Sequence, residues 1–338
     1  MSASILDTPL CSLLGVRYPI VQAGMGYVAR AELCAAVSEA GGLGMIGAAS
    51  LTPGELRDEI RKVKGRTKQP FGVDVLFATI GRPAADAASA RFTREVEQQL
   101  DVIFEERVPV LASGLGDPAP ALPTARALGM KVLALVGNTA NARKVAASGV
   151  DVVVAQGYDG GGHTGSVGTL ALLPAVVDAV DVPVVAAGGI ADGRGLVAAL
   201  ACGAVGAWIG TRFVASAEAY AHDAYKQRIV EIDDSGTTRT RCFSGKPCRV
   251  IRNATTEAWE ARELQDRILP FPRQFRVMGE WLGEDPYIAG RRQGKVDIGA
   301  LAAGQSSVLI DSVLPAGRIV EQLVAEAREV LGRLGAAS

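Results

Sequence analysis

One stretch of the chain combines a histidine with a run of glycines in a way that suits ligand chemistry. Residues 151–165 read DVVVAQGYDGGGHTG, so His163 directly follows Gly160, Gly161 and Gly162. Consecutive glycines let the backbone adopt angles closed to other residues and approach a ligand closely. The chain has only 2 histidines, and histidine is the side chain whose charge ordinarily changes near neutral pH. We therefore expect His163 to be catalytic; the alternative is that it caps a turn.

Two further glycine turns have the composition of a phosphate site. Gly188 and Gly189 follow one apolar run, and Gly210 and Thr211 follow the next. Backbone amides ahead of a helix favour a phosphate dianion, because the amides are exposed and the helix dipole is positive there. Thr211 adds a hydroxyl group. We predict that the two turns bind phosphate together; the alternative is that both serve helix packing.

Eight short apolar runs are the elements that must position these groups. Continuous runs rich in valine are typical of strands buried on both faces of a parallel sheet. Strands are expected at residues 18–22, 43–46, 70–76, 108–112, 131–135, 151–155, 182–186 and 205–209. Helices are expected at 31–40, 52–64, 82–106, 139–148 and 320–334. The second of these begins with a capping-box pattern formed by Thr52 and Glu55.

The alternation of strands and helices predicts the fold class, a closed parallel (β/α)8 barrel, or TIM barrel. The competing layout is a doubly wound open sheet. Gly24 and Gly26 come nearest to the dinucleotide motif of that fold, but the third glycine and the following acidic residue are missing. In a TIM barrel the active site lies at the carboxyl ends of the strands, and phosphate commonly binds after strands seven and eight. The two glycine turns fall at those strand ends.

The regular alternation of predicted strands and helices ends after the eighth strand. We expect residues 1–215 and 305–338 to form the barrel and residues 216–304 to be a mainly helical insertion that acts as a lid. Lysine and arginine outnumber acidic residues between positions 239 and 295. This excess is either an ordinary solvated face or part of a lid that draws an anion toward the barrel mouth.

The composition argues against several classes of partner. The 338-residue chain has a formal net charge of -1, which gives no reason to expect nucleic acid or a membrane surface as a partner. It shows no leader pattern and no apolar run of membrane-spanning length. Its 5 cysteines are odd in number and have no zinc-type spacing. We therefore expect reduced thiols, no metal site and a cytoplasmic protein.

The loops after the other strands are small and neutral. They include Ala23 to Met25, Ser113 with Gly114, and Gln156 with Gly157. Such loops suit a flat ring whose edge is bonded by backbone amides and a side-chain amide, and flavin mononucleotide (FMN) is a phosphate-bearing ligand of this kind. The alternative from another class is a flavin-free, phosphate-binding isomerase or aldolase, which would need a lysine or paired acids at these strand ends.

Four runs of sequence resemble the FMN-dependent nitronate monooxygenase family, formerly called 2-nitropropane dioxygenases. They are PIVQAGMGYVARAELCAAVSEAGGLGMIGAAS, QPFGVDVLF, GVDVVVAQGYDGGGHTG and PVVAAGGIADGRGLVAALACGAVGAWIGTRFVAS, with a weaker echo in AGQSSVLID. The similarity extends from residue 15 to about residue 255. FMN-dependent enoyl-thioester reductases and NADH:quinone reductases resemble the same runs. The resemblance implies a TIM-barrel flavoprotein oxidoreductase.

Matching motif by motif, the resemblance also implies a set of site residues. His163 matches the family's active-site histidine. The residues implied to contact FMN are Gln22, Ala23, Gly24 and Met25 under the ring, Gln156, Gly161, Gly162 and Gln305 near it, and Gly188, Gly189, Gly210 and Thr211 at the phosphate. Asp74 stands where the family usually has Asn. A carboxylate there cannot donate a hydrogen bond to the ring unless it is protonated.

The resemblance implies two kinds of reaction on small-molecule substrates. In the first, electrons pass from an alkyl nitronate to FMN, and oxygen addition breaks the C–N bond to give a carbonyl compound and nitrite. In the second, NAD(P)H supplies electrons for the reduction of an enoyl-CoA or acyl-carrier-protein thioester, or of a quinone. Arg249 and Arg252 of the basic insertion would suit the phosphates of CoA. The assembly is left open, with a homodimer as one alternative.

Overall fold

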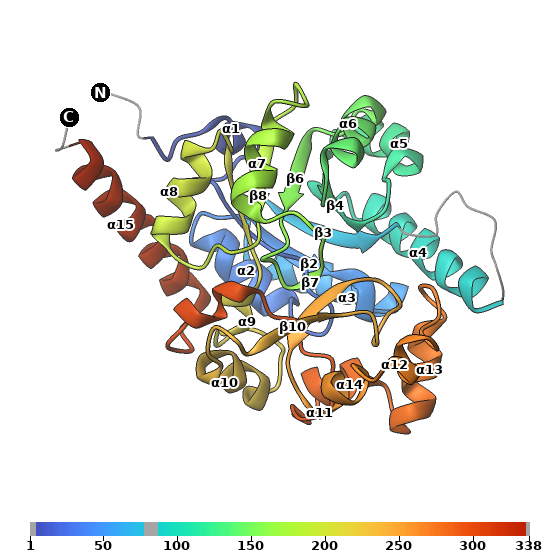
Figure 1. The fold of residues 1–338 in the computed structure, drawn as a ribbon. Helices are drawn as coiled ribbons and strands as arrows, with labels where there is room; N and C mark the ends of the chain where they lie inside the picture. The colour runs from blue at the N-terminus through green and yellow to red at the C-terminus, as the bar shows by residue number, and fades with distance from the viewer. Residues whose placement is uncertain (1–4, 78–86, 336–338) are drawn as a thin grey trace.

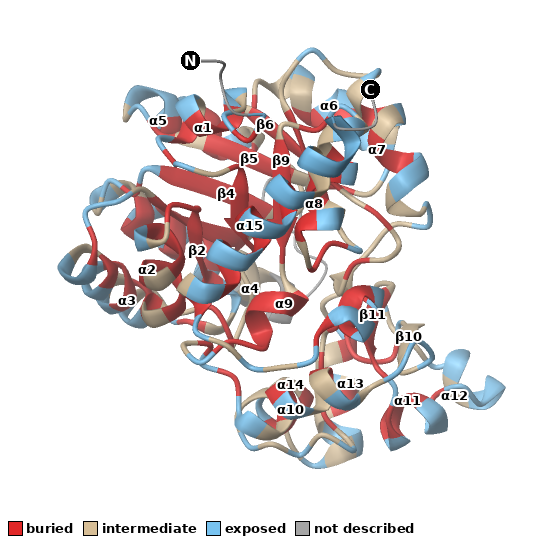
Figure 2. Cartoon of the chain, turned by 90° about the vertical axis from the view of Figure 1, so that its left-hand side faces the viewer, coloured by how far each residue is buried: buried red, intermediate tan, exposed pale blue. Residues whose placement is uncertain are grey.

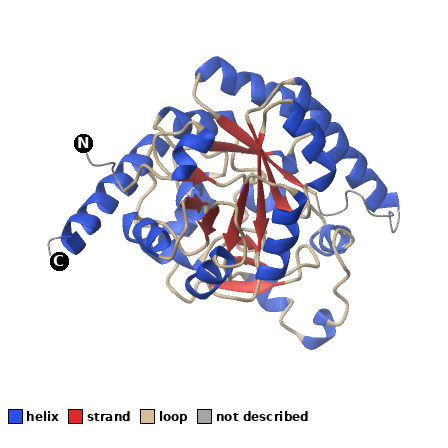
Figure 3. Cartoon of the chain, turned by 90° about the horizontal axis from the view of Figure 1, so that it is seen from above, coloured by secondary structure: helices blue, strands red, loops and turns tan. Residues whose placement is uncertain are grey.

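The protein is described by a computed structural model that covers residues 5–77 and 87–335. Eight parallel strands form one sheet in the order β1-β9-β8-β6-β5-β4-β3-β2. A bridge between Val21 of β1 and Leu43, just ahead of β2, joins the two edges, so the strands form a barrel surrounded by helices (Figure 3). The strands are β1 (Ile20–Gln22), β2 (Gly44–Gly47), β3 (Phe71–Leu76), β4 (Val110–Leu115), β5 (Lys131–Val136), β6 (Val152–Gln156), β8 (Val184–Ala187) and β9 (Gly206–Ile209). The TIM-barrel prediction is confirmed.

Helices connect the successive strands and cover the outside of the barrel (Figure 1). They are α2 (Ala31–Glu39), α3 (Pro53–Arg66), α4 (Ala87–Glu105), α5 (Leu122–Ala127), α6 (Thr139–Ser148), α7 (Thr169–Val177) and α8 (Gly193–Ala201), with α1 (Pro9–Leu14) ahead of β1. Of the helix predicted at 82–106, residues 82–86 lie outside the described part of the chain. The predicted capping box is confirmed, because Thr52 N donates to Glu55 Oε2 (2.8 Å) and Glu55 N donates to Thr52 Oγ1 (3.3 Å).

The long helix that completes the outer layer of the barrel after β9 comes from the C-terminal end of the chain. Directly after β9 there is only the short helix α9 (Thr211–Val214). The long helix α15 (Ala316–Gly335) packs against α8 and α2 and begins four residues before the predicted start at 320. The segment after the insertion therefore returns to the barrel and completes its outer layer.

The core consists of two apolar layers, one inside the barrel and one between the barrel and its helices. Val152 and Val154 belong to the inner layer together with Trp208. Val153 and Ala155 belong to the outer layer. Both sets are buried, and the barrel strands are red along most of their length in Figure 2. Burial on both faces explains why the run in β6 is continuously apolar rather than alternating.

The insertion contains two strands as well as the expected helices. Its elements are α10 (Asp223–Glu231), β10 (Thr237–Thr240), β11 (Cys248–Ile251), α11 (Ala254–Ala258), α12 (Arg262–Gln265), α13 (Gln274–Leu282) and α14 (Pro286–Arg291). They lie together at one end of the barrel (Figure 1). The elements from β11 to α14 surround an apolar cluster that includes Phe243, Trp259 and Met278, whereas Tyr225 and Ile229 of α10 belong to the outer layer of the barrel. β11 pairs antiparallel with β10 and with β7 (Gly162–His163). The division of the chain into barrel and lid units stays a prediction.

Within residues 5–77 and 87–335, every helix is too short or too polar to span a bilayer.

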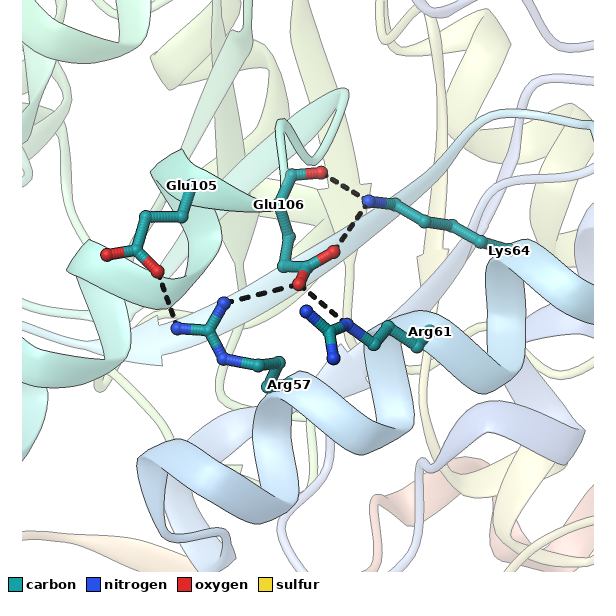
Figure 4. A network of polar contacts seen from close by, with 5 residues as sticks. All are labelled: Arg57, Arg61, Lys64, Glu105 and Glu106. Carbon is teal, nitrogen blue, oxygen red and sulfur yellow. Dashed lines mark hydrogen bonds and ion pairs between the residues drawn. The ribbon is translucent and has the colours of Figure 1, made fainter.

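A cluster of ion pairs ties α3 to the end of α4 on the outside of the barrel (Figure 4). The carboxylate of Glu106 accepts hydrogen bonds from Lys64 Nζ (2.9 Å), Arg61 Nε (2.9 Å) and Arg57 Nη1 (3.2 Å). Among the residues that the structure describes, Glu105 accepts only from Arg57 Nη2. The side chain of Glu106 is 11% exposed and that of Glu105 is 61% exposed. Glu106 is therefore the residue on which the cluster depends.

We predict that Glu106→Gln lowers the free energy of unfolding by about 1–2 kcal/mol, because three cations lose their shared, nearly buried counter-ion. The control Glu105→Gln should cost about 0.5 kcal/mol or less, since exposed single pairs contribute little. Hydrogen bonding from Lys64 lowers the pKa of Glu106, so its contribution is lost as the pH falls through the lowered pKa. Urea unfolding of both variants tests this, and equal losses would contradict it.

Candidate active site

A cavity of about 430 Å³ opens at the carboxyl ends of the barrel strands, beneath the insertion. Its lower wall comes from strand ends and the loops that follow them, and Phe275, Tyr287 and Arg291 of the insertion contribute to its cover. Most of the predicted site residues line this cavity. They are Ala23, Gly24, Met25, Asp74, Gln156, Gly161, Gly162, His163, Gly188, Gly189, Gly210 and Thr211. Residues spread over most of the sequence are thus brought to one place.

Gln22 and Gln305 do not line the cavity. Gln22 is fully buried, and its side chain bonds both the N–H and the carbonyl of Met45 (3.0 and 3.2 Å), so it ties β1 to β2. Gln305 is exposed, and its backbone N–H donates to Asp159 O (2.9 Å). Sequence matching placed the right segments at the site but not these two side chains.

His163 lies in the roof of the cavity and is held from both sides. Its Nε2 lies 2.9 Å from Ser244 Oγ of the insertion, and its backbone carbonyl accepts from Gln156 Nε2 (3.1 Å). Burial, followed by the nearby cations Lys246 and Arg291, lowers the pKa of His163 to about 4. The imidazole is therefore neutral at neutral pH, where it offers one hydrogen-bond donor and one acceptor.

Asp74 is a buried carboxyl at the floor of the cavity, only 7% exposed. It lies between two glycines: a Cβ added at Gly24 would be 2.2 Å from Asp74 Cβ, and one added at Gly114 would be 2.6 Å from Asp74 Oδ1. Asp74 Oδ1 has no hydrogen-bond partner among the described residues. Burial raises the pKa of Asp74 well above its ordinary value. This shift favours the neutral acid, which can donate a hydrogen bond as the amide of Asn would.

The two glycine turns both face the cavity, but the helix contribution predicted for them is partly wrong. Gly188 and Gly189 have φ angles of 94° and 76°, a region open chiefly to glycine. The first amides of α8 are already bonded to carboxylates, since Gly195 N donates to Asp192 Oδ1 (3.0 Å) and Gly193 N donates to Glu326 Oε2 (2.8 Å). The positive end of α8 is therefore neutralised within the protein. A phosphate bound here would therefore be held by the backbone amides of the turns and not by the first amides of α8.

The turn after β9 keeps its predicted hydroxyl close to the cavity. Thr211 Oγ1 accepts a hydrogen bond from Gly304 N (2.9 Å), so its own proton remains available to donate to a ligand. The same bond fixes the segment after the insertion beside the turn. Gly304 and Ser306 of that segment line the cavity, whereas their neighbour Gln305 does not.

Arg291 is a site residue that sequence reasoning missed. It lines the cavity, donates to Gly26 O (3.0 Å) and Ala300 O (2.8 Å), and lies over the Tyr287 ring at 4.8 Å. It forms no ion pair with any residue in the described ranges. The only signal in the sequence was the general excess of basic residues, which does not distinguish Arg291 from its neighbours.

The two arginines expected to bind CoA phosphates have other partners. Arg249 is only 3% exposed, donates to Tyr158 O (3.1 Å) and lies over the Tyr158 ring at 4.4 Å. Arg252 pairs with Glu260 on the surface (3.0 Å). Neither lines the cavity. The expectation for these two residues is therefore wrong: Arg249 fixes the glycine loop, and Arg252 belongs to an exposed ion pair.

The chemistry of the site rests on hydrogen bonding and on one cation. In the described part of the chain, no three His, Cys, Asp or Glu side chains gather as metal ligands would. The cavity combines a neutral imidazole, the buried carboxyl of Asp74, the Arg291 guanidinium and glycine backbone. Asp285 also lines it, with its Oδ1 accepting from the N–H groups of Tyr287 and Ile288 at the start of α14. This arrangement can hold a flat anionic ligand and orient a second, small anion beneath the roof.

Comparisons with known proteins agree with this architecture. An enzyme of Mycobacterium tuberculosis named "(3aS,4S,5R,7aS)-5-hydroxy-7a-methyl-1-oxo-octahydro-1H-indene-4-carboxyl-CoA dehydrogenase" is 35% identical, with 95% of this chain and 96% of that protein covered. The structure of FabK from Thermotoga maritima is similar with a TM-score of 0.86 and 34% identity, covering 98% of this chain and 99% of that one. The structure of nitroalkane oxidase from Streptomyces ansochromogenes is similar with a TM-score of 0.81 and 33% sequence identity. The match covers 96% of this chain and 99% of that one.

The model of one protein family, described as nitronate monooxygenase, matches residues 7–326. This range includes all the cavity-lining residues named above. The relatives are oxidoreductases, so the isomerase and aldolase alternative has no support. The protein is an oxidoreductase of the nitronate monooxygenase family.

Proposed function

We propose that the cavity holds FMN and that the enzyme oxidises alkyl nitronates with dioxygen, giving a carbonyl compound and nitrite. The observation that carries the choice of substrate is Arg291, a cation that lines the cavity without a carboxylate partner among the described residues. An unpaired cation in a partly enclosed site attracts an anionic substrate. A nitronate is already the deprotonated form of a nitroalkane, so its oxidation needs no strong base.

The residues present fit a flavin. The volume of about 430 Å³ lies in the range of small-molecule sites, roughly 300–1,000 Å³. A Cβ added at Gly162 would meet nothing within 4 Å, and one added at Gly210 would be 3.6 Å from its nearest neighbours. Side chains at these positions would therefore occupy cavity space that glycine leaves to a ligand. Asp74 adds a buried oxygen without a partner at the floor.

Different parts of the cavity would hold different parts of the cofactor. The turns at Gly188, Gly189, Gly210 and Thr211 would bind the phosphate, and Ala23, Gly24 and Met25 would underlie the ring. Asp74 would donate a hydrogen bond to the ring as a neutral acid. Gln156 already donates to the carbonyls of Gly161 and His163, so it would face the ring with its oxygen. When bound, FMN would supply two-electron transfer and reaction with dioxygen.

His163 and Arg291 would position the substrate. Arg291 would balance the charge of the nitronate, while the neutral imidazole of His163 would donate or accept one hydrogen bond near its α-carbon. With a pKa of about 4, His163 is a weak base at neutral pH. This favours a substrate that arrives as an anion over one whose C–H proton must be removed.

NAD(P)H-dependent reduction of an enoyl thioester is the second candidate. It is favoured by a second cavity of about 320 Å³ that shares His163 with the first and extends outward from it. A small nitronate has no use for this additional space. The M. tuberculosis relative is named a carboxyl-CoA dehydrogenase, which supports a CoA thioester as the substrate although it names an oxidation.

The phosphate assignment predicts that Gly189→Asp lowers FMN affinity on the order of 100-fold, because a carboxylate would face the phosphate at close range. Gly189→Asn is the matched control, since it has the same shape, no charge and tolerance of positive φ. Fluorescence titration of flavin-free protein measures both affinities. If the Asp and Asn variants bind FMN equally, electrostatic repulsion is absent and the phosphate lies elsewhere.

The burial of Asp74 predicts a pH dependence of folding stability, which can be measured without an activity assay. Burial raises its folded-state pKa, so its contribution to stability is fully present below the ordinary pKa and is lost as the pH rises through the raised one. Urea unfolding of flavin-free protein should therefore show wild type losing stability relative to Asp74→Asn from acidic to alkaline pH. The exposed Asp178→Asn serves as control. A constant difference between wild type and Asp74→Asn would show that Asp74 is not held neutral.

The reaction itself is tested by mixing the yellow protein with substrates under anaerobic conditions. Alkyl nitronates should bleach the flavin absorbance rapidly, NADH and NADPH should bleach it at least about 100-fold more slowly, and nitrite should appear after air is admitted. Rapid bleaching by NAD(P)H without nitrite would reject nitronate oxidation and favour thioester reduction.

A further inference from the structure

The second cavity opens between the carboxyl ends of β4 and β5, the start of α6 and the turn before β11. It shares Gly114, Leu135, Gln156 and His163 with the first cavity. His163 is thus a wall common to both spaces. A molecule with its reacting group under His163 could extend its remainder into the second cavity without leaving the protein.

The second cavity is more polar than the first and carries positive charge. Lys144 of α6 and Lys246 of the insertion line it, against the single carboxylate of Asp117. Lys144 pairs with Asp117 at 3.0 Å, but its side chain is 64% exposed. A pair this exposed is worth little, so Lys144 can exchange Asp117 for a ligand at small cost.

Neutral hydrogen-bonding groups complete the lining. Asn138 and Asn141 stand at the first turn of α6, whose ten residues give it a positive N-terminal end facing the cavity. Thr164 also lines the space, and its Oγ1 has no hydrogen-bond partner among the described residues. Lysines, amides and a hydroxyl group are the donors that phosphate oxygens require.

Two of the glycines that line the second cavity, Gly137 and Gly165, bring their backbones into close contact. A Cβ added at Gly137 would lie 2.9 Å from Gly165 Cα, and one added at Gly165 would lie 2.4 Å from Gly137 O. The loops after β5 and β7 therefore touch through their backbones. This contact holds the start of α6 at a set position relative to His163.

We propose that the second cavity is a subsite for the phosphate-bearing tail of an extended ligand whose reacting end lies beneath His163. The tail would run past Gln156 and place its phosphate between Lys144 and Lys246. The ligand would be a phosphorylated acyl carrier such as CoA or a phosphorylated nicotinamide donor, which share this group. The proposal rests on the flavin site described above, and it deepens the second candidate reaction.

Calorimetric titration of the FMN-bound protein tests the subsite. Coenzyme A and 4′-phosphopantetheine should each bind about tenfold or more tightly than pantetheine, as expected for charge-assisted hydrogen bonds. Pantetheine lacks both the phosphates and the adenosine of coenzyme A, whereas it differs from 4′-phosphopantetheine only by the phosphate. Lys144→Ala and Lys246→Ala should each weaken coenzyme A several-fold and leave pantetheine unchanged. Lys68→Ala is the matched control, because Lys68 is an exposed lysine outside both cavities.

A parallel titration with NADPH distinguishes the two sources of phosphate. If only NADPH weakens in the two variants, the subsite serves the electron donor; if only coenzyme A weakens, it serves the acyl carrier. Lys144→Ala replaces an exposed side chain, so its folding is not at risk. Equal affinity for coenzyme A and pantetheine, or equal losses in Lys68→Ala and Lys144→Ala, would overturn the subsite. Flavin content, measured in the same samples, reports separately on the FMN proposal.

Discussion

The pairing of β7 with β11 is the interaction on which the site depends. His163 lies opposite Cys248, and Gly162 lies opposite Arg249, so a loop of the barrel becomes the edge strand of a sheet in the insertion. The same loop also contacts the segment that follows the insertion, since a Cβ added at Gly161 would lie 2.8 Å from Ala303 C. Only glycine fits there. His163 is therefore positioned by residues from three separate parts of the sequence, and moving any of them would move the roof of the cavity.

The electrostatic character of the cavity follows from this enclosure. Once the roof is closed, burial pushes His163 and Asp74 toward their neutral forms, with the pKa of His163 lowered and that of Asp74 raised. The carboxylate of Asp285 also lines the cavity, but it is held at the start of α14, where it accepts from the N–H groups of Tyr287 and Ile288. Arg291 is the cation of the cavity lining, and it forms no ion pair with Asp285 or with any other described residue. FMN phosphate and a nitronate, or a phosphorylated thioester, would supply the missing negative charge.

Local patterns in the sequence predicted the features that depend on residues close together in the chain. The strands of the barrel, the capping box at Thr52 and the glycine turns all depend on residues near one another in the chain, and the structure has them where they were expected. The predictions that were wrong or missing concerned residues whose partners lie far away in the sequence. The partner of Gly193 is Glu326, more than a hundred residues away, and Arg249 is buried by a loop that no spacing rule connects with it. Likewise, no local pattern links Arg291 to the barrel mouth, where it contacts Gly26.

We propose that FMN lies between Asp74 at the floor of the cavity and His163 in its roof, and a crystal structure of the protein with bound FMN is the most direct test. We expect the ring above Ala23, Gly24 and Met25, within hydrogen-bond distance of the Asp74 carboxyl, and the phosphate at the turns containing Gly189 and Gly210. Flavin bound elsewhere on the protein would rule this arrangement out, as would a ring that makes no contact with Asp74 while His163 points away from it.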